Sequence, residues 1–376
     1  MSAHDPERHP GSAQSVEDLA RRLFIVVASL AFLSETATAQ VTTTSGDTPA
    51  IRVGVTFFGD YTYTKEPTAK DADGNDIHNS SFNVARTYIN VTGNISHLIA
   101  FRITPDVVRT ASDSGSALGG SLVFRVKFAY AQFNLGDWLP RSYARFGVQP
   151  NTWSDFVDGI YRYRFQGPTF AEREGYFTSS DAGVSFHYDL PSNYGDAHVS
   201  FFNGENYNRA EVNDQKALMV RASLRPFAQQ TSILRGVRAS VFYDDDHYVR
   251  NAERTRLLGG LFFEHPYVTT GFEYLDAHDQ PSITSNNVHG KGYAIWAIPR
   301  SSKGWEALLR FDHLVPNTAI DTQARNRTIM GIAYWFPVQG TVTAALLLDY
   351  DGLTVEHFEP AQPAQRRIAL HALINY

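Results

Sequence analysis

Hydrophobic and polar residues alternate with a period of two along most of the chain after Gln40. In segment 122–130 one face carries Leu122, Phe124, Val126, Phe128 and Tyr130. The same alternation recurs in 184–189, 217–225 and 305–312. Because successive side chains of a β-strand point to opposite faces, each segment predicts a strand with one apolar and one largely polar face.

About sixteen such segments can be counted, within a range of roughly 14 to 18 that the pattern allows. They lie near 51–63, 82–93, 97–110, 121–135, 142–150, 182–190, 196–204, 215–226, 235–244, 255–264, 266–276, 290–299, 304–314, 327–336, 341–350 and 366–376. The links between them mostly alternate between long and short, with 227–234 intermediate. Outer-membrane barrels have long extracellular loops and short periplasmic turns. We therefore predict an all-β fold, a transmembrane antiparallel β-barrel over 51–376 that most closely fits sixteen strands.

The N-terminal segment has the three parts of a secretory signal peptide. Arg21-Arg22 precedes the apolar run Leu23–Leu33, and Ala37-Thr38-Ala39 follows it. We predict a cleaved signal peptide over 1–39 and a short lead-in over 40–50. The alternative is a buried helix of a soluble domain. The apolar run is too short for a membrane-spanning helix, which needs about 20 residues.

Composition narrows the functional classes. The 376 residues include 25 Phe, 19 Tyr, 5 Trp and 27 Gly, but no Cys. The absence of Cys excludes disulfides, thiolate metal sites and cysteine nucleophiles. The formal net charge of −6 lacks the basic excess that nucleic-acid binding requires.

The last segment supports export to the outer membrane. Ile368, Leu370, Ala372 and Ile374 alternate with more polar residues, and the chain ends on Tyr376. This looks like the terminal strand of bacterial outer-membrane proteins, which the barrel-assembly machinery reads. The alternative is an ordinary edge strand.

If the apolar faces meet lipid, the inward faces are strongly basic. The candidate pore-lining residues are Arg86, Arg102, Arg125, Lys127, Arg145, Arg221 and Arg225. Rings or stripes of basic side chains in a water-filled pore attract anions. In the alternative, these residues pair with carboxylates and only hold the barrel open.

The longest link, 151–181, combines aromatic residues with paired charges. As the third long loop of a sixteen-stranded barrel, it resembles the porin constriction loop that bends into the lumen. We expect Arg162 and Arg164 to share one face of a short extended stretch as candidate constriction residues. Their alternative role is pairing with Asp155, Asp158, Glu172 or Glu174.

Four stretches resemble the phosphate-selective porin O and P family. They are Phe124–Tyr130, Arg145–Pro150, Ser180–Val184 and Val199–Gly204. The resemblance implies a sixteen-stranded homotrimeric porin that passes small anions along a basic ladder, to which Arg125, Lys127 and Arg145 would belong. The sequence departs from that pattern in the predicted loop after the ninth strand, where Asp244-Asp245-Asp246 would oppose the entry of anions.

The sequence therefore predicts a passive outer-membrane channel with modest anion preference, with phosphate as a candidate solute, in contact with lipid and lipopolysaccharide. One alternative is a substrate-specific uptake channel for oligosaccharides or organic acids, and a less favoured one is an outer-membrane barrel hydrolase. We expect no enzyme activity, no cofactor and no metal site. The loop 71–76 lacks the Glu that would close a calcium loop.

Overall fold

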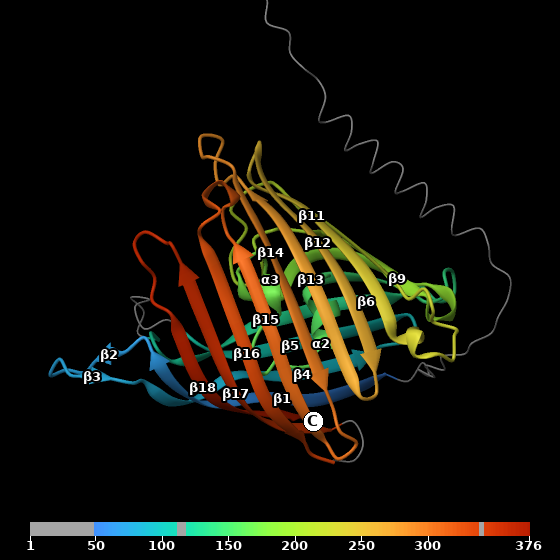
Figure 1. Cartoon of the computed structure of the whole chain (residues 1–376). Coiled ribbons are helices and arrows are strands. Elements are labelled where there is room, and N and C mark those ends of the chain that lie inside the picture. Colours follow the sequence, from blue (N-terminus) through green and yellow to red (C-terminus); the bar gives the residue numbers. More distant parts are fainter. Residues whose placement is uncertain (1–48, 111–117, 338–341) are drawn as a thin grey trace, which may run out of the picture. The chain divides into compact units, whose positions relative to one another are not determined.

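The computed structural model describes residues 49–110, 118–337 and 342–376, and in them sixteen antiparallel strands form one closed barrel (Figure 1). The strands are β1 (Ala50–Glu66), β4 (Ser80–Asn94), β5 (Ile99–Arg109), β6 (Leu122–Asn134), β7 (Ser142–Pro150), β8 (Ser180–Asp189), β9 (Gly195–Phe202), β10 (Ala217–Leu224), β11 (Val237–Val249), β12 (Ala252–His265), β13 (Val268–Asp279), β14 (Val288–Pro299), β15 (Trp305–Val315), β16 (Ala324–Trp335), β17 (Thr343–Glu356) and β18 (Gln365–Asn375). Each pairs with the next, and β18 pairs with β1. The predicted fold class and strand number are confirmed. The predicted signal peptide and residues 40–48 of the lead-in lie outside the described residues.

Closure of the barrel depends on a close backbone approach at Gly54. The backbone N–H and C=O of Val55 exchange hydrogen bonds of 2.9 Å with those of Tyr376. A Cβ added to Gly54 would lie 2.5 Å from the carbonyl oxygen of Tyr376. Glycine therefore lets the last residue of the chain reach the first strand.

The outer face of the barrel is apolar, as the alternation predicts. Val53, Phe146, Leu261 and Ile332 are among its large exposed side chains. Exposed aromatic residues gather where the strands are joined by 135–141, 190–194, 266–267, 300–304 and 336–342. They are Trp138, Tyr194, Tyr267, Trp305, Phe336 and Tyr376. An apolar band edged by aromatic residues is the surface that a barrel presents to lipid.

We call the barrel end with these links the turn end and the opposite end the loop end. The turn-end links also include 95–98 and 225–236, while the loop end has 67–79, 110–121, 151–179, 203–216, 250–251, 280–287, 316–323 and 357–364. Two links break the predicted contrast in length, because 225–236 is long and 250–251 is a two-residue turn.

The predicted loop after the ninth strand is wrong. β11 and β12 pair in one register as far as His247, with Asp244 opposite Arg256 and Asp246 opposite Arg254, and then shift before the turn at 250–251. These opposite charges on paired residues extend the ladder. Asp244–Asp246 therefore lie in a strand, and Asp244 and Asp246 are buried.

The face predicted for Phe128 and Tyr130 is also wrong. The pairing of β5 with β6 shifts between Thr104 and Pro105, which leaves Lys127 as an extra residue in β6. Such a bulge reverses the alternation beyond it. Phe128 and Tyr130 therefore turn inward, where Arg102 and Arg145 lie over their rings.

The remaining elements are short. Within the described residues there are two α-helices, α2 (Ser154–Tyr161) and α3 (Phe170–Arg173), and both lie in the link 151–179. The strands β2 (Ala69–Lys70) and β3 (Asp76–Ile77) form a separate hairpin, and the 3₁₀ turns are η2 (Pro191–Asn193), η3 (Ile233–Gly236) and η4 (Thr318–Ile320). In the described part of the chain, every helix is too short or too polar to cross a membrane.

Candidate functional site: the inner face of the barrel

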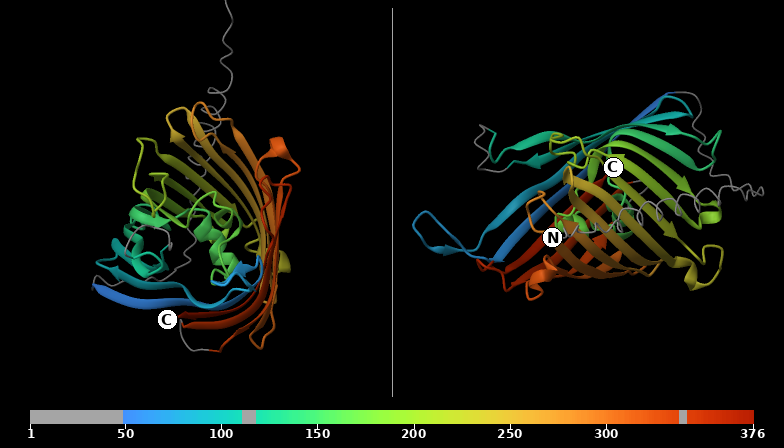
Figure 2. Two further views of the ribbon diagram at one scale, coloured as in Figure 1. Left: turned by 90° about the vertical axis from the view of Figure 1, so that its left-hand side faces the viewer. Right: turned by 90° about the horizontal axis from the view of Figure 1, so that it is seen from above.

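The link 151–179 packs against the inner face of the barrel. In the left view of Figure 2 its green helices lie within the ring of strands. Trp153, Tyr161 and Tyr163 have no exposed surface. Their rings contact Phe242 of β11 at 5.8 Å, Trp296 of β14 at 5.2 Å and Trp335 of β16 at 5.9 Å between centroids. Because aromatic side chains bury large apolar areas, these contacts fix the link to the strands.

Polar contacts anchor the same link to β15, β16 and β17. The Tyr163 hydroxyl donates to Glu306 Oε2 at 2.8 Å. Arg310 Nη1 donates to the carbonyl oxygen of Pro168 at 3.0 Å, and Arg325 Nε lies 3.2 Å from Glu174 Oε2. The link is thus held by both ring packing and buried charge.

The link also contacts β1, which lies two strands beyond β17 in the ring. The ring of Phe165 lies 6.4 Å from that of Phe58 on β1. The link ends at Ser179, two residues before the end of the predicted segment 151–181, because β8 begins at Ser180.

The prediction that Arg162 and Arg164 share one face of an extended stretch is wrong. Arg162 follows α2 with a φ of 65°, and Arg164 lies in a turn. The Arg162 guanidinium lies over the Trp335 ring at 4.4 Å and 3.4 Å from Glu306 Oε1. Arg164 makes two contacts of 2.5 Å with Glu172 and one of 3.3 Å with Asp158. The contacts of Arg164 are therefore those of the alternative interpretation, in which it pairs with Asp158 and Glu172.

The two carboxylates on Arg164 differ in proton affinity. Burial raises the pKa of Asp158 to about 6, against the opposing effect of the Arg164 charge. Burial also acts to raise the pKa of Glu172, but Arg164, at 2.5 Å, holds that pKa below its ordinary value. Arg164 therefore keeps Glu172 as its ionised partner when Asp158 takes up a proton.

Six cationic side chains on β1 and β4–β7 form what we call the basic wall: Arg52, Arg86, Arg102, Arg125, Lys127 and Arg145. Asp106 Oδ2 lies 2.5 Å from Arg86 Nη1 and 3.2 Å from Arg125 Nη2. Asp106 is fully buried. One carboxylate thus serves two arginines near the middle of these strands.

The other members of the basic wall contact neutral groups. Lys127 Nζ donates to the Tyr88 hydroxyl at 3.0 Å. Arg102 Nη2 donates to Asn90 Oδ1 at 2.9 Å, and Arg145 Nε donates to Gln132 Oε1 at 2.9 Å. Arg145 also lies over the rings of Tyr130 and Tyr143 at 4.7 and 4.5 Å. Such contacts orient a guanidinium but leave its charge uncompensated.

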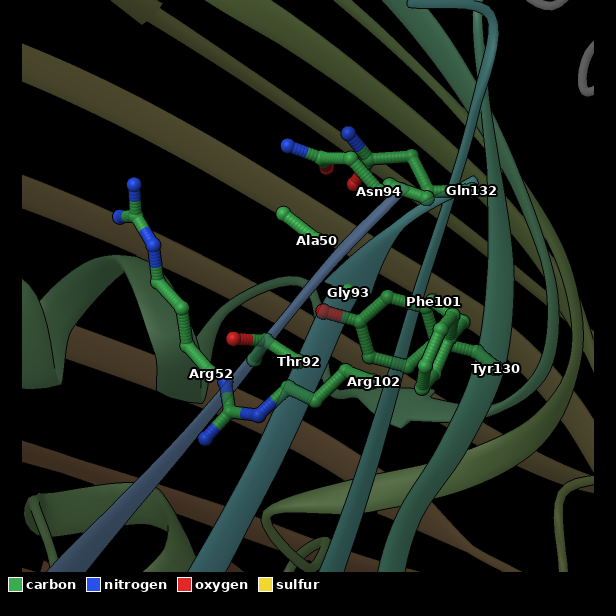
Figure 3. Close-up of a pocket in the computed structure, with 10 residues that line it drawn as sticks. Ala50, Arg52, Thr92, Gly93, Asn94, Phe101, Arg102, Tyr130 and Gln132 are labelled. Atoms are coloured by element: carbon green, nitrogen blue, oxygen red, sulfur yellow. The ribbon is translucent and has the colours of Figure 1, made fainter. Parts of the chain in front are cut away.

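Arg52 and Arg102 line a cavity of about 340 Å³ near the turn end. In Figure 3 their side chains extend to the same side of the strands, and Thr92 lies on the strand between them. Asn94, Tyr130 and Gln132 complete its polar lining. Within the described residues neither guanidinium has a carboxylate partner.

Arg221 and Arg225 lie elsewhere and are paired. Arg221 is buried, forms an ion pair with Asp196 and donates to the Thr152 carbonyl oxygen at 3.1 Å. Arg225 Nη2 lies 2.5 Å from Glu264 Oε2. These two therefore have the contacts of the alternative interpretation, as do Arg86 and Arg125, which share Asp106.

Arg52 and Asp106 were not predicted as site residues from the sequence. Arg52 alternates with the exposed Ile51, Val53 and Val55, so period two alone assigns it inward. Asp106 follows Arg102 and Thr104 on one face of β5 in the same way. Only the pairing of β5 with β4 and β6 shows which cations Asp106 reaches.

Comparison with solved structures shows a porin-like barrel. The anion-selective porin from Comamonas acidovorans superposes with a TM-score of 0.60 at 11% identity, over 88% of this chain and 100% of that one. The outer membrane channel DcaP of Acinetobacter baumannii gives 0.56 at 11%, over 90% and 100%. The trimer form of OmpT, an outer membrane protein of Vibrio cholerae, gives 0.55 at 11%, over 87% and 99%. No family model matches the sequence, and no curated protein matches it. At these identities the likeness is one of fold, without confirmation of the O and P family.

Proposed function

We propose that the chain is a porin of the bacterial outer membrane, a passive diffusion channel for small hydrophilic solutes with a modest anion preference. The basic wall carries this proposal, since within the described residues Asp106 is the one carboxylate that forms an ion pair with any of its six cations. The uncompensated charge raises the concentration of anions beside these strands. The porin-like barrel fold supports the class of protein.

In this proposal the link 151–179 forms the constriction. It packs against β11, β14 and β16 and, through Phe165, against β1, so solutes pass beside the link along the exposed part of the basic wall. Arg162 and Arg164 lie on the link, and Arg162 is the more exposed, with 38% of its side chain against 17% for Arg164. Selection is by size and by charge, and no covalent step is required.

We also propose a homotrimer, because the trimer form of Vibrio cholerae OmpT shares the fold. Tyr376 would be the residue that the barrel-assembly machinery reads, and the apolar outer face would contact lipid and lipopolysaccharide. The substrate class is small anions in general rather than phosphate, because guanidinium and ammonium groups attract all of them.

The test is the reversal potential of the purified protein in planar bilayers under a salt gradient. The wild type should prefer anions, and replacing Arg125, Lys127 and Arg145 with Gln should shift the preference towards cations. A charge-matched control replaces Arg235, Arg250 and Lys303, which are exposed outside the basic wall, with Gln. Cation preference of the wild type would overturn the anion claim, and absence of conductance would overturn the channel.

A further inference from the structure

A second cavity, of about 250 Å³, lies on the inner face of β7–β11 beside the link. Its lining differs from that of the basic wall, because it combines two histidines with three carboxylates. We call this group the histidine pocket: Tyr143, Asp155, His187, Asp189, Asp196 and His198. The proposed channel function makes no use of it.

The two histidines face each other across neighbouring strands. His187 of β8 pairs with His198 of β9 in the ladder. Their ring centroids lie 5.2 Å apart and the rings are nearly perpendicular, at 87°. Two imidazoles that bind one metal ion tetrahedrally at about 2.0–2.1 Å have ring centres about 5 Å apart. The spacing therefore suits a shared ion.

The hydrogen bond from His187 to Asp189 determines which ring nitrogen is free. His187 Nε2 lies 3.0 Å from Asp189 Oδ1, and a carboxylate accepts hydrogen bonds, so the proton belongs on Nε2. The lone pair is then on Nδ1, which is buried without a hydrogen-bond partner. Metal-binding histidines are oriented by carboxylates in this way.

His198 supplies the second free nitrogen. Its side chain is more than nine-tenths buried, and its Nε2 also has no hydrogen-bond partner. A buried polar atom without a partner is costly unless something else satisfies it. Two such nitrogens on adjacent, facing rings point to a missing ligand that accepts electron pairs.

The surrounding charges favour a cation. Asp196 Oδ2 lies 3.9 Å from His187 Nδ1, and Asp189 is largely exposed to the cavity. Arg221 and Arg238 also line the cavity, but they are paired with Asp196 and Glu264. Within the described residues neither the Asp155 nor the Asp189 carboxylate forms an ion pair with an arginine or lysine, although Arg141 donates to the Asp189 main-chain oxygen and His187 to Asp189 Oδ1. A cation entering the pocket therefore meets two carboxylates that no arginine or lysine neutralises.

We propose that His187 and His198 bind a divalent transition-metal cation that favours imidazole, such as Ni²⁺, Zn²⁺ or Cu²⁺. Within the described residues no three His, Asp or Glu side chains already converge on one point, so water completes the coordination. A bound ion would add charge and bulk to the inner face near the turn end. It would therefore reduce conductance through the proposed channel.

Another histidine pair provides a matched control. His278 of β13 and His289 of β14 also face each other in the ladder, beside Asp276. Their centroids are only 3.9 Å apart with the rings tilted by 37°, which is too close for a shared tetrahedral ion. Replacing this pair removes the same groups without touching the histidine pocket.

The deciding measurement is Ni²⁺ binding to the full-length barrel in detergent, by equilibrium dialysis against NiCl₂ at pH 7.5. We expect one Ni²⁺ per chain, with affinity at least tenfold weaker in His187→Gln and in His198→Gln. The double variant His278→Gln, His289→Gln should bind like the wild type. Binding that is absent, or unchanged in the first two variants, or lost in the control, would overturn the proposal.

Two further readouts separate this proposal from the channel and from misfolding. The thermal unfolding of each variant, followed by the β-sheet circular dichroism, should match the wild type, because glutamine preserves the polar lining. In bilayers, NiCl₂ should lower the wild-type conductance reversibly on chelation but leave the His187→Gln conductance unchanged. Equal inhibition of both proteins would contradict the assigned position, whereas a barrel without conductance still reports Ni²⁺ binding by dialysis.

Discussion

The inner faces of β1 and β4–β7 and of β14–β17 both carry arginines, but what those arginines touch differs. On β14–β17, Arg310 Nη2 lies 2.7 Å from Asp312 Oδ2 and Arg327 Nη1 lies 2.6 Å from Asp351 Oδ1. On the basic wall, Arg102 and Arg145 contact amides and aromatic rings. Pairing, rather than the number of arginines, therefore distinguishes the two sides, and the proposed anion preference depends on the less paired one.

The same difference explains where the link lies. The faces of β14 and β16 add Trp296 and Trp335 to their ion pairs, and the link packs its aromatic rings against them. The basic wall offers uncompensated charge, which is better solvated by water than by aromatic rings. The link therefore packs Tyr161 and Tyr163 on the paired side. On the basic wall Lys127 is buried, whereas Arg86 and Arg125 keep 32% and 28% of their side chains exposed.

The largest expected effect is a loss of unfolding free energy when the Arg310–Asp312 ion pair beneath the link is broken. Arg310→Met would leave Asp312 buried without its partner, because both side chains are almost fully buried. Breaking a buried pair costs about 3–5 kcal/mol. We expect the unfolding free energy in urea to fall by about this much, and the conductance to rise because Arg310 no longer holds Pro168.

The double variant Arg310→Met, Asp312→Leu is the control, since removing both charges should recover most of the stability. If Arg310→Met instead changed only the selectivity, Arg310 would act like the basic wall and the contrast between the two sides would fail.

How much of this was predictable from sequence depends on the range of the interactions. Alternation within one strand assigns Glu306, Arg310 and Asp312 to the inner face of β15, as the structure has them. Lys127 faces inward as predicted, but the alternation fails after it, at Phe128 and Tyr130, because a bulge at Lys127 shifts the register. Nothing local marks that bulge, because it arises from the pairing of β6 with β5.

The partners in the ion pairs of the inward-facing side chains were also not predictable from the sequence. Arg173 and Asp351 lie 3.4 Å apart although they are far apart in the sequence, and the same holds for Arg162 and Glu306. Sequence patterns indicate that a side chain points inward, but only the closed barrel shows which inward side chain stands opposite. The split between paired and unpaired arginines therefore needed the structure.

The second prediction concerns the anion-to-cation permeability ratio alone. Arg52→Gln combined with Arg102→Gln removes two charges from the cavity near the turn end without exposing a buried partner. A unit charge about 5 Å from a passing ion contributes about 1 kcal/mol in water. We expect the anion-to-cation permeability ratio to fall about fivefold or more, with the unfolding free energy within about 1 kcal/mol of wild type. A comparable fall in Arg225→Gln, whose charge is paired with Glu264, would remove the distinction between paired and unpaired arginines.

The smallest effect is a pH dependence that arises on the link, between the two sides. Because burial raises the pKa of Asp158 to about 6, acidification from pH 7.5 to 5 should neutralise it while Glu172 stays ionised on Arg164. The passage then loses one negative charge, and the anion-to-cation permeability ratio should rise about twofold.

The same proton affects stability. The folded state binds it more tightly than the unfolded chain does, so the contribution of Asp158 to stability increases as the pH falls from about 6 towards its ordinary pKa. At pH 7.5, Asp158→Asn should already have the anion-to-cation permeability ratio that the wild type reaches at pH 5. Its ratio should then lack the twofold rise on acidification. If the variant keeps the full response, the titrating group lies elsewhere, and the histidine pocket is the next region to test.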